Sequence, residues 1–210
     1  MLVLYHGSDK VVTTPQYGKG ERTNDYGQGF YLTEHPELAA EWACPREGVD
    51  GVINRYELSL DSMNVLDLDQ QPFEHWISIL VQHRNNDMGT AARERMGRFV
   101  AMYPYSVAEY DIVKGWRADD SYYAFIRAFF NAALSLENLS KAMYLGDYGT
   151  QYCLLSRRSF ESIRYTSHEE VSADEYFAKR EERDRQAKSL FLEMPNKASG
   201  TLIIDIVGRD

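Results

Sequence analysis

Cysteine is scarce in this chain, whose 210 residues contain only Cys44 and Cys153. The two lie far apart and lack the spacing of metal ligands, which argues against a disulfide-rich scaffold and against a cysteine-based metal site. We therefore predict a protein of a reducing compartment and expect a cytoplasmic location. The four histidines that follow His6 stand singly, without metal-ligand spacing, so no metal site is expected.

Long apolar runs and an excess of positive charge are missing as well. No run approaches the roughly 18 apolar residues that span a bilayer, and the opening segment Met1–Tyr5 lacks the basic leading region of a signal peptide. We therefore expect no membrane partner. Lysine and arginine number 23 against 32 aspartates and glutamates, a formal net charge of -9. That balance argues against broad electrostatic binding to duplex DNA or anionic lipid, but it permits a local basic channel.

Apolar residues are plentiful enough for one folded domain. They make up 44% of the chain, and 15 tyrosines are typical either of a ligand cleft or of ordinary core filling. Short strand patterns at both ends flank helical periodicity in the middle, which predicts a single α+β domain over residues 1–210. The expected parts are a helical insertion at about 72–147, a charged and solvated helix at about 172–194 that begins at Ser172, and a final apolar strand at 201–207.

The most informative stretch is Asp25-Tyr26-Gly27-Gln28-Gly29-Phe30-Tyr31-Leu32-Thr33, which is followed by Trp42. Its two glycines accept backbone angles closed to other residues and let a flat ligand approach the main chain. Phe30 and Tyr31 are expected to alternate across a strand, and a helix that begins after Pro36 carries Trp42 back toward it. Taken alone, the stretch is more typical of a tight turn before a buried strand than of a ligand site.

Two further motifs change that interpretation: His6-Gly7-Ser8 upstream, and Tyr148-Gly149-Thr150-Gln151-Tyr152 at the start of a late strand. In this order the three pieces resemble the ADP-ribosyltransferases of the diphtheria-toxin and poly(ADP-ribose) polymerase branch, whose His, Tyr and Glu lie on three separate strands. A longer resemblance, which includes Arg117-Ala118-Asp119-Asp120-Ser121-Tyr122, is to a bacterial family of that superfamily, domain of unknown function 3990, over roughly residues 2–165. It implies an ADP-ribosyltransferase-like split β-sheet core and NAD as a substrate.

The resemblance also implies a role for each residue. The main chain of Gly7 would bind the nicotinamide carboxamide, and His6 would hold a ribose hydroxyl. Tyr31 and Trp42 would enclose the nicotinamide ring, each stack being worth on the order of 1 kcal/mol. Arg22 would pair with the pyrophosphate, because a guanidinium forms two parallel bonds to phosphate oxygens. The expected NAD-binding residues are His6, Gly7, Ser8, Arg22, Gly29, Tyr31, Trp42 and Gln151.

Gln151 stands where the polymerase branch has its catalytic Glu, and this is the main departure from the superfamily pattern. A Gln side chain can bind the ribose hydroxyl but brings no charge, and a full charge at about 4 Å would be worth roughly 4 kcal/mol at an effective dielectric near 20. Asp119 or Asp120 would substitute as a general base for the acceptor, although either is equally suited to cap the next helix. The expected catalytic residues are His6, Tyr31, Gln151 and Asp120.

The sequence leaves three functions open. The first is an NAD-dependent mono-ADP-ribosyltransferase that modifies a protein or nucleic-acid acceptor, as a toxin with an antitoxin partner or in phage defence. The second is a non-catalytic module that binds NAD or ADP-ribose, with Gln151 as the sign of lost chemistry. The third is a partner-binding domain that uses its tyrosine-rich cleft and its charged helix for protein contacts.

Overall fold

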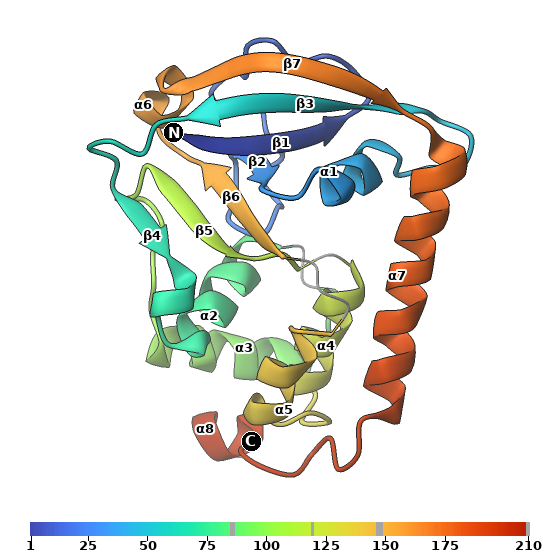
Figure 1. Cartoon of the computed structure of the whole chain (residues 1–210). Helices are drawn as coiled ribbons and strands as arrows, with labels where there is room; N and C mark the ends of the chain where they lie inside the picture. Colours follow the sequence, from blue (N-terminus) through green and yellow to red (C-terminus); the bar gives the residue numbers. More distant parts are fainter. Residues whose placement is uncertain (85–86, 119, 146–148, 209–210) are drawn as a thin grey trace.

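The structure, a computed structural model, describes residues 1–84, 87–118, 120–145 and 149–208. It confirms the predicted mixed α+β class: a twisted sheet lies above a group of helices (Figure 1). Seven strands in the described ranges form one sheet, in the order β4-β5-β6-β2-β1-β3-β7. The strands are β1 Leu2–Ser8, β2 Phe30–Thr33, β3 Gly51–Leu58, β4 Val65–Asp67, β5 Ile112–Trp116, β6 Thr150–Leu154 and β7 Ile163–Val171.

Helices lie beside β1, below the sheet and along one side of the molecule, and the short α6 lies at the start of β7 (Figure 1). Their bounds are α1 Pro36–Ala43, a 3-10 turn Leu68–Gln70, α2 Phe73–His83, α3 Thr90–Met102, α4 Asp120–Phe130, α5 Leu136–Ala142, α6 Arg157–Glu161, α7 Ala173–Glu193 and α8 Ile203–Val207. The region 72–147 thus contains α2 to α5 and also the strand β5.

The sheet divides at its centre. β1 pairs with β3 at every position from Leu2 to Ser8, and β2 pairs with β6 at every position from Phe30 to Thr33. Between these halves, β1 and β2 share only one paired position, Tyr5 with Thr33. A single paired position leaves the remainder of the two central strands room to diverge, and the cavity described below opens beside them.

The largest hydrophobic core lies between the β4–β6 half of the sheet and the helices α2 to α5. Fully buried rings fill it, among them Trp76, Phe99 and Phe129. Alternate residues of β5 and β6 belong to different clusters, as the two-residue period of a strand requires: Val113 faces the helical core, and Ile112 belongs to a second cluster on the other side of the sheet. This packing fixes the ends of β5 and β6 that reach the cavity.

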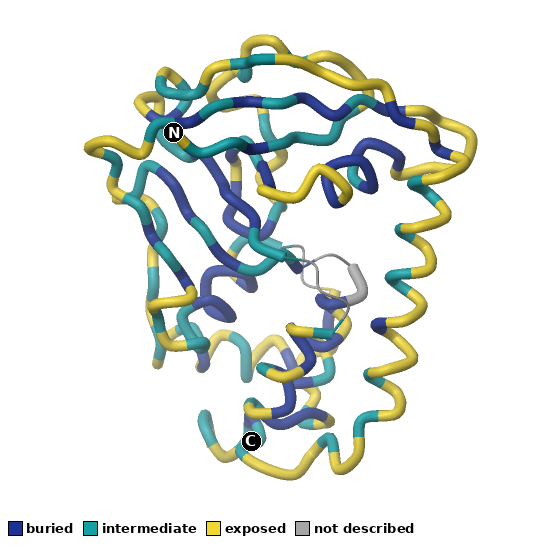
Figure 2. The backbone as a smooth tube through the Cα atoms, in the orientation of Figure 1, coloured by how far each residue is buried: buried dark blue, intermediate teal, exposed yellow. Residues whose placement is uncertain are grey.

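The charged helix begins where the sequence predicts, because the Ser172 hydroxyl accepts a hydrogen bond from the backbone N–H of Asp174. α7 runs from the end of β7 to the lower helices and is exposed over much of its length (Figures 1 and 2). It packs against α1 and α4. Its charges do more than form pairs within the helix, since Arg183 and Lys179 also pair with Glu41 and Glu37 of α1. The solvated face is therefore partly an attachment to α1.

The prediction of a final strand at 201–207 is wrong, because Ile203–Val207 form the helix α8. The Asp205 carboxylate accepts a hydrogen bond from the backbone N–H of Leu202, which caps the first turn. Ile203 is fully buried in the helical core. A short apolar run is compatible with a buried strand and with a buried helical turn. Here the hydrogen bond that Asp205 accepts from Leu202 favours the helical turn.

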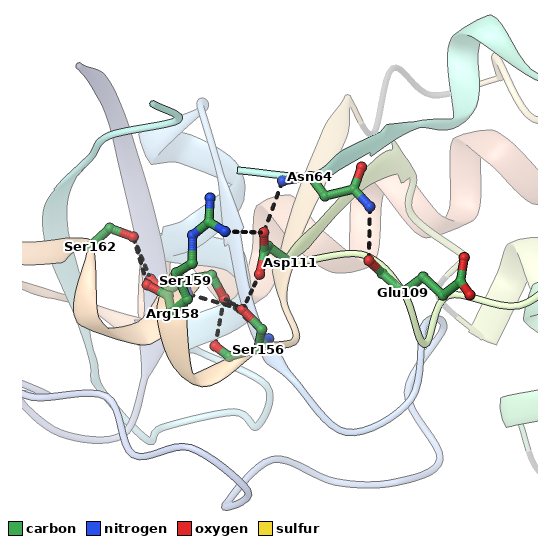
Figure 3. Close-up of polar contacts among 7 residues, drawn as sticks. All are labelled: Asn64, Glu109, Asp111, Ser156, Arg158, Ser159 and Ser162. Atoms are coloured by element: carbon green, nitrogen blue, oxygen red, sulfur yellow. Dashed lines mark hydrogen bonds and ion pairs between the residues drawn. The ribbon is translucent and has the colours of Figure 1, made fainter. Parts of the chain in front are cut away.

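A polar corner ties the start of β5 to α6 (Figure 3). The Asp111 carboxylate accepts hydrogen bonds from the Ser156 hydroxyl at 2.6 Å and from the backbone N–H of Asn64 at 2.8 Å, and Arg158 lies 3.9 Å away. Ser156 also caps α6 by accepting from the backbone N–H of Ser159. These hydrogen bonds hold the pKa of Asp111 below its ordinary value.

Within the described ranges, no helix combines the length and the apolar character that a bilayer span requires.

Candidate functional site

One cavity of about 950 Å³ opens beside the divided centre of the sheet. Its volume is near the upper end of the roughly 300–1,000 Å³ typical of small-molecule sites. Its walls include His6 of β1, Tyr31 of β2, Trp42 of α1 and Gln151 of β6. The segment between β1 and β2 closes another side with residues 10–16. The cavity thus brings together four residues from four separate elements that the sequence singles out.

The neighbours of His6 fix which of its ring nitrogens carries a proton in the neutral form. Its Nδ1 lies 2.8 Å from the backbone carbonyl oxygen of Tyr31, and its ring packs against Phe30 at 4.3 Å between centroids. A carbonyl only accepts, so Nδ1 carries the proton. Burial lowers the pKa of His6, the largest influence on that group, and favours the neutral ring. Nε2 is consequently a hydrogen-bond acceptor.

Tyr31 is held by the turn that precedes it. Its hydroxyl donates to the carbonyl of Gly27 at 2.8 Å and accepts from the backbone N–H of Tyr26 at 2.9 Å, while the rings of Tyr26 and Tyr31 stack at 6.4 Å. Gly27 has a φ of 81°, a conformation that favours glycine. Burial raises the pKa of Tyr31 well above its ordinary value, so the phenol stays neutral. The turn therefore fixes the position of the ring.

The glycines at the site serve packing more than ligand approach. A side chain at Gly29 would meet the Cys153 sulfur at 2.3 Å, and one at Gly7 would meet the Ala39 carbonyl oxygen at 1.8 Å. Gly29 lines the cavity with its backbone and lets β2 lie against β6. Gly7 lets α1 lie against β1, which is how Trp42 reaches the cavity.

Trp42 already has a partner on its ring. The guanidinium carbon of Arg117 lies 4.8 Å from the ring centroid, a cation–π arrangement. The indole Nε1 is buried and has no hydrogen-bond partner among the described residues. A planar ligand that is to stack on the face that Arg117 covers must displace its guanidinium.

Gln151 is 3% exposed and meets a carboxylate to which the sequence reasoning assigned no role. Its Nε2 donates to Asp25 Oδ2 at 2.8 Å and to the backbone carbonyl of Trp116 at 3.2 Å. The same Asp25 oxygen accepts from the backbone N–H of Ala118 at 2.8 Å. Asp25 is 5% exposed, and its Oδ1 lies 3.5 Å from Arg84 Nη1. Burial, the largest influence, raises the pKa of Asp25, and Arg84 opposes the rise.

Positive charge gathers at the cavity although the whole chain is acidic. The charged residues among those that line it are one acid, Asp25, and five bases, Lys10, Lys19, Arg84, Arg117 and Arg180. Arg180 comes from α7, where it also donates to the Pro45 carbonyl at 3.0 Å. The cavity is therefore suited to an anion in a chain whose formal net charge is -9.

Several predicted site residues do not line this cavity. Arg22 is exposed and is not among the described residues of its wall, and neither are Gly7 and Ser8. The Ser8 hydroxyl donates to the Lys10 carbonyl at 2.6 Å and so holds the segment that closes the cavity. Asp120 is the first residue of α4. Its side chain, together with Asp119 and Tyr148, lies outside the described residues.

Arg183 fixes the helix that carries Trp42. Its guanidinium donates through both Nη2 and Nε to the Glu41 carboxylate, at 2.8 Å and 3.1 Å. Glu41 is 1% exposed, so this pair is anchored in the interior. α7 therefore holds α1 from outside the sheet and supplies Arg180 to the cavity.

The chain is an α+β domain with an open mixed sheet, and a basic cavity opens beside the centre of that sheet. A family model described as "Protein of unknown function (DUF3990)" matches residues 2–165, and the chain belongs to that family, as its motifs predicted. No curated protein and no solved structure matches the chain. The family match ends at residue 165, before α7, so Arg180 and Arg183 come from a part of the chain that the match does not cover.

Proposed function

We propose that the cavity binds NAD and that the chain is a mono-ADP-ribosyltransferase, which moves ADP-ribose from NAD to a protein or nucleic-acid acceptor. The observation that supports this most is the convergence of His6, Tyr31, Trp42 and Gln151 on one cavity. The resemblance to ADP-ribosyltransferases assigns these same four residues to the nicotinamide and ribose of NAD. A split in the hydrogen bonding between β1 and β2 agrees with the split sheet expected of that superfamily.

The chemistry of the proposed reaction matches what the residues offer. The bond between ribose C1′ and the nicotinamide nitrogen breaks, and its electron pair stays on the nitrogen, so that the pyridinium leaves as neutral nicotinamide. Positive charge builds on the ribose until an acceptor nucleophile forms the new bond to C1′ and loses a proton. The protein must hold the leaving group, orient the ribose and stabilise the charge. His6 Nε2 accepts from a ribose hydroxyl, and Tyr31 and Trp42 enclose the pyridine ring.

The cations of the cavity support a dinucleotide over an uncharged ligand. NAD carries two negative phosphates, and arginine binds phosphate through two parallel hydrogen bonds. Arg117 and Arg180 line the cavity, whereas Arg22 is not among the described residues of its wall. We therefore assign the pyrophosphate to Arg117 and Arg180. The roles of a toxin and of an antitoxin partner rest on the resemblance alone and stay predictions.

The test is nicotinamide release and label transfer from NAD. His6→Asn is a sharp variant, because the Asn amide keeps a donor for the Tyr31 carbonyl and removes the Nε2 acceptor. We expect nicotinamide release to fall at least about tenfold, as for loss of one hydrogen bond to a transition state. His168→Asn, at an exposed histidine on β7, is the matched control and should leave release unchanged. Equal release from both variants would contradict the assignment of His6.

A non-catalytic module is the second candidate, and the uncharged Gln151 favours it. It predicts saturable binding of NAD without release of nicotinamide and without label on any acceptor. Calorimetry with NAD, followed by chromatography of the same samples, separates the two candidates. Absence of NAD binding at millimolar concentration would contradict both and leave a partner-binding domain.

A further inference from the structure

The two oxygens of the Asp25 carboxylate have different partners. Oδ2 accepts two hydrogen bonds, whereas the buried Oδ1 accepts none within the described part of the chain and has only the Arg84 guanidinium at 3.5 Å. Asp25 also lines the cavity. A carboxylate has about four acceptor positions, and a buried one that fills only part of them is costly unless something else binds there. Asp25 is therefore placed to act on a ligand as well as on the fold.

The hydrogen bonds of Gln151 fix which end of its amide is left over. Both partners of Nε2, the Asp25 carboxylate and the Trp116 carbonyl, are acceptors, so both amide hydrogens are used. The amide cannot be flipped without setting oxygen against oxygen. Oε1 is therefore the end that can accept from a ligand hydroxyl. Because the amide of Gln151 donates to an ionised carboxylate, its oxygen Oε1 becomes a stronger hydrogen-bond acceptor.

We propose that Asp25 and Gln151 act as a pair, in which Asp25 supplies the negative charge and Gln151 Oε1 passes it to a hydroxyl of the nicotinamide ribose. This inference rests on the proposed function. The pair then replaces the single Glu of the polymerase branch, with the charge one hydrogen bond deeper. When the C1′ to nitrogen bond breaks and its electrons leave with nicotinamide, the pair stabilises the positive ribose. Water or the acceptor then bonds to C1′ and gives its proton to solvent.

A purely structural role for Asp25 is the competing explanation, since it also holds Ala118 and pairs with Arg84. The two roles differ in what the charge does for the fold. Burial raises the pKa of Asp25, which means that the folded state disfavours the charged form. Within the described ranges, the ionisable groups that influence Asp25, or that it influences, are Arg84, Arg117, Tyr26, Tyr31, Tyr123 and Cys153. A neutral isostere should therefore fold at least as well and lose only the chemistry.

The experiment moves the charge between the two positions. Asp25→Asn removes it, Gln151→Glu adds a second one 2.8 Å from the first, and the double variant Asp25→Asn, Gln151→Glu exchanges the two groups. Nicotinamide release from NAD, NAD affinity and thermal unfolding are measured for each. We expect Asp25→Asn to lower kcat by about a hundredfold, with NAD affinity kept and the unfolding midpoint equal to or above that of the natural chain. The exchange variant should recover at least about tenfold of that loss, because its carboxylate again reaches the ribose.

Gln151→Glu alone is not expected to raise turnover at neutral pH, because two adjacent buried carboxylates share a proton. The rate of nicotinamide release by this variant should instead change with pH in a range where the rate of the natural chain is constant. The control is Asp111→Asn, which removes a carboxylate at the far end of β5 and should leave kcat unchanged.

The inference fails if Asp25→Asn folds and keeps full kcat, or if it loses kcat and the exchange variant recovers none. It also fails if the loss of release follows a loss of thermal stability in all three variants, since that is the mark of a structural carboxylate. A natural chain that neither binds NAD nor releases nicotinamide contradicts the proposed function itself. That outcome is distinguishable, because it is seen before any substitution is made.

Discussion

Asp25 in the cavity and Asp111 in the polar corner are both carboxylates that bind backbone N–H groups, yet their surroundings act in opposite directions. Hydrogen bonds lower the pKa of Asp111, and the charge stabilises the corner of Figure 3. Burial raises the pKa of Asp25, and its Oδ1 has no hydrogen-bond partner in the described ranges. The charged form of Asp111 stabilises the fold. The burial of Asp25 at the cavity wall destabilises the fold when Asp25 is charged, and such an arrangement is typical of a functional site.

The largest expected difference between the two sites is in the stability lost when the arginine partner of each carboxylate, Arg84 or Arg158, is removed. Arg84 lies 3.5 Å from a carboxylate that is almost fully buried, and its own side chain is 18% exposed. Arg84→Met leaves a buried charge unpaired, which should lower the free energy of unfolding by about 3 kcal/mol. Arg158 lies 3.9 Å from Asp111 and is 52% exposed, so Arg158→Met should cost no more than about 0.5 kcal/mol. Urea unfolding of both variants at neutral pH measures the difference.

Equal losses of stability in these two variants would contradict the difference between the sites, because they would show that Asp25 needs its arginine partner no more than Asp111 does. The double variant Asp25→Asn, Arg84→Met is a further test of this difference. The second substitution removes the unpaired charge, so the double variant should regain most of the stability lost.

The pH dependence of stability should have opposite signs at the two sites. The folded pKa of Asp111 is depressed, so its contribution is present above its ordinary value of 3.8 and is lost as pH falls through the folded pKa. The folded pKa of Asp25 is raised, so its contribution is present below 3.8 and is lost as pH rises through the folded pKa. Relative to the natural chain, Asp25→Asn should therefore gain stability as pH rises above 3.8, and Asp111→Asn should approach it as pH falls below 3.8. Unfolding curves across this range test both signs, and equal signs would contradict the account.

Ser156→Ala should lower the free energy of unfolding by less than Arg84→Met does. It removes the 2.6 Å hydrogen bond to Asp111 and the cap of α6 together. We expect a loss of about 1–2 kcal/mol in the free energy of unfolding. Nicotinamide release should be unchanged, because the corner lies at the end of β5 away from Trp116. A fall in release without a fall in stability would show that the corner acts on the cavity.

Local patterns in the sequence were sufficient for the charged helix. Ser172 begins α7 as its cap, as predicted, because period and capping chemistry are properties of neighbouring residues. α8 was wrongly predicted as a strand because the apolar content of 201–207 says nothing of its period over so few residues. The attachment of α7 to α1 was missed, since Arg183 and Glu41 are 142 residues apart.

The site residues that belong to sequence motifs could be predicted, whereas those that only the fold brings to the cavity could not. His6, Tyr31, Trp42 and Gln151 belong to motifs, and all four line the cavity. Asp25 stands in the same glycine stretch, but its partner Gln151 is 126 residues away, and only the fold brings the two together. Arg180 had no motif at all. Two side chains that meet only through the fold leave no local pattern in a sequence, which is why the pairing of Asp25 with Gln151 was not foreseen.

The most direct test of the central claim is the structure of the chain crystallised with NAD. The account predicts the pyridine ring between Tyr31 and Trp42, with the Arg117 guanidinium moved from the Trp42 ring toward the pyrophosphate and Gln151 Oε1 on a ribose hydroxyl. NAD bound elsewhere, or a cavity in which Arg117 still covers Trp42 at saturating NAD, would contradict it.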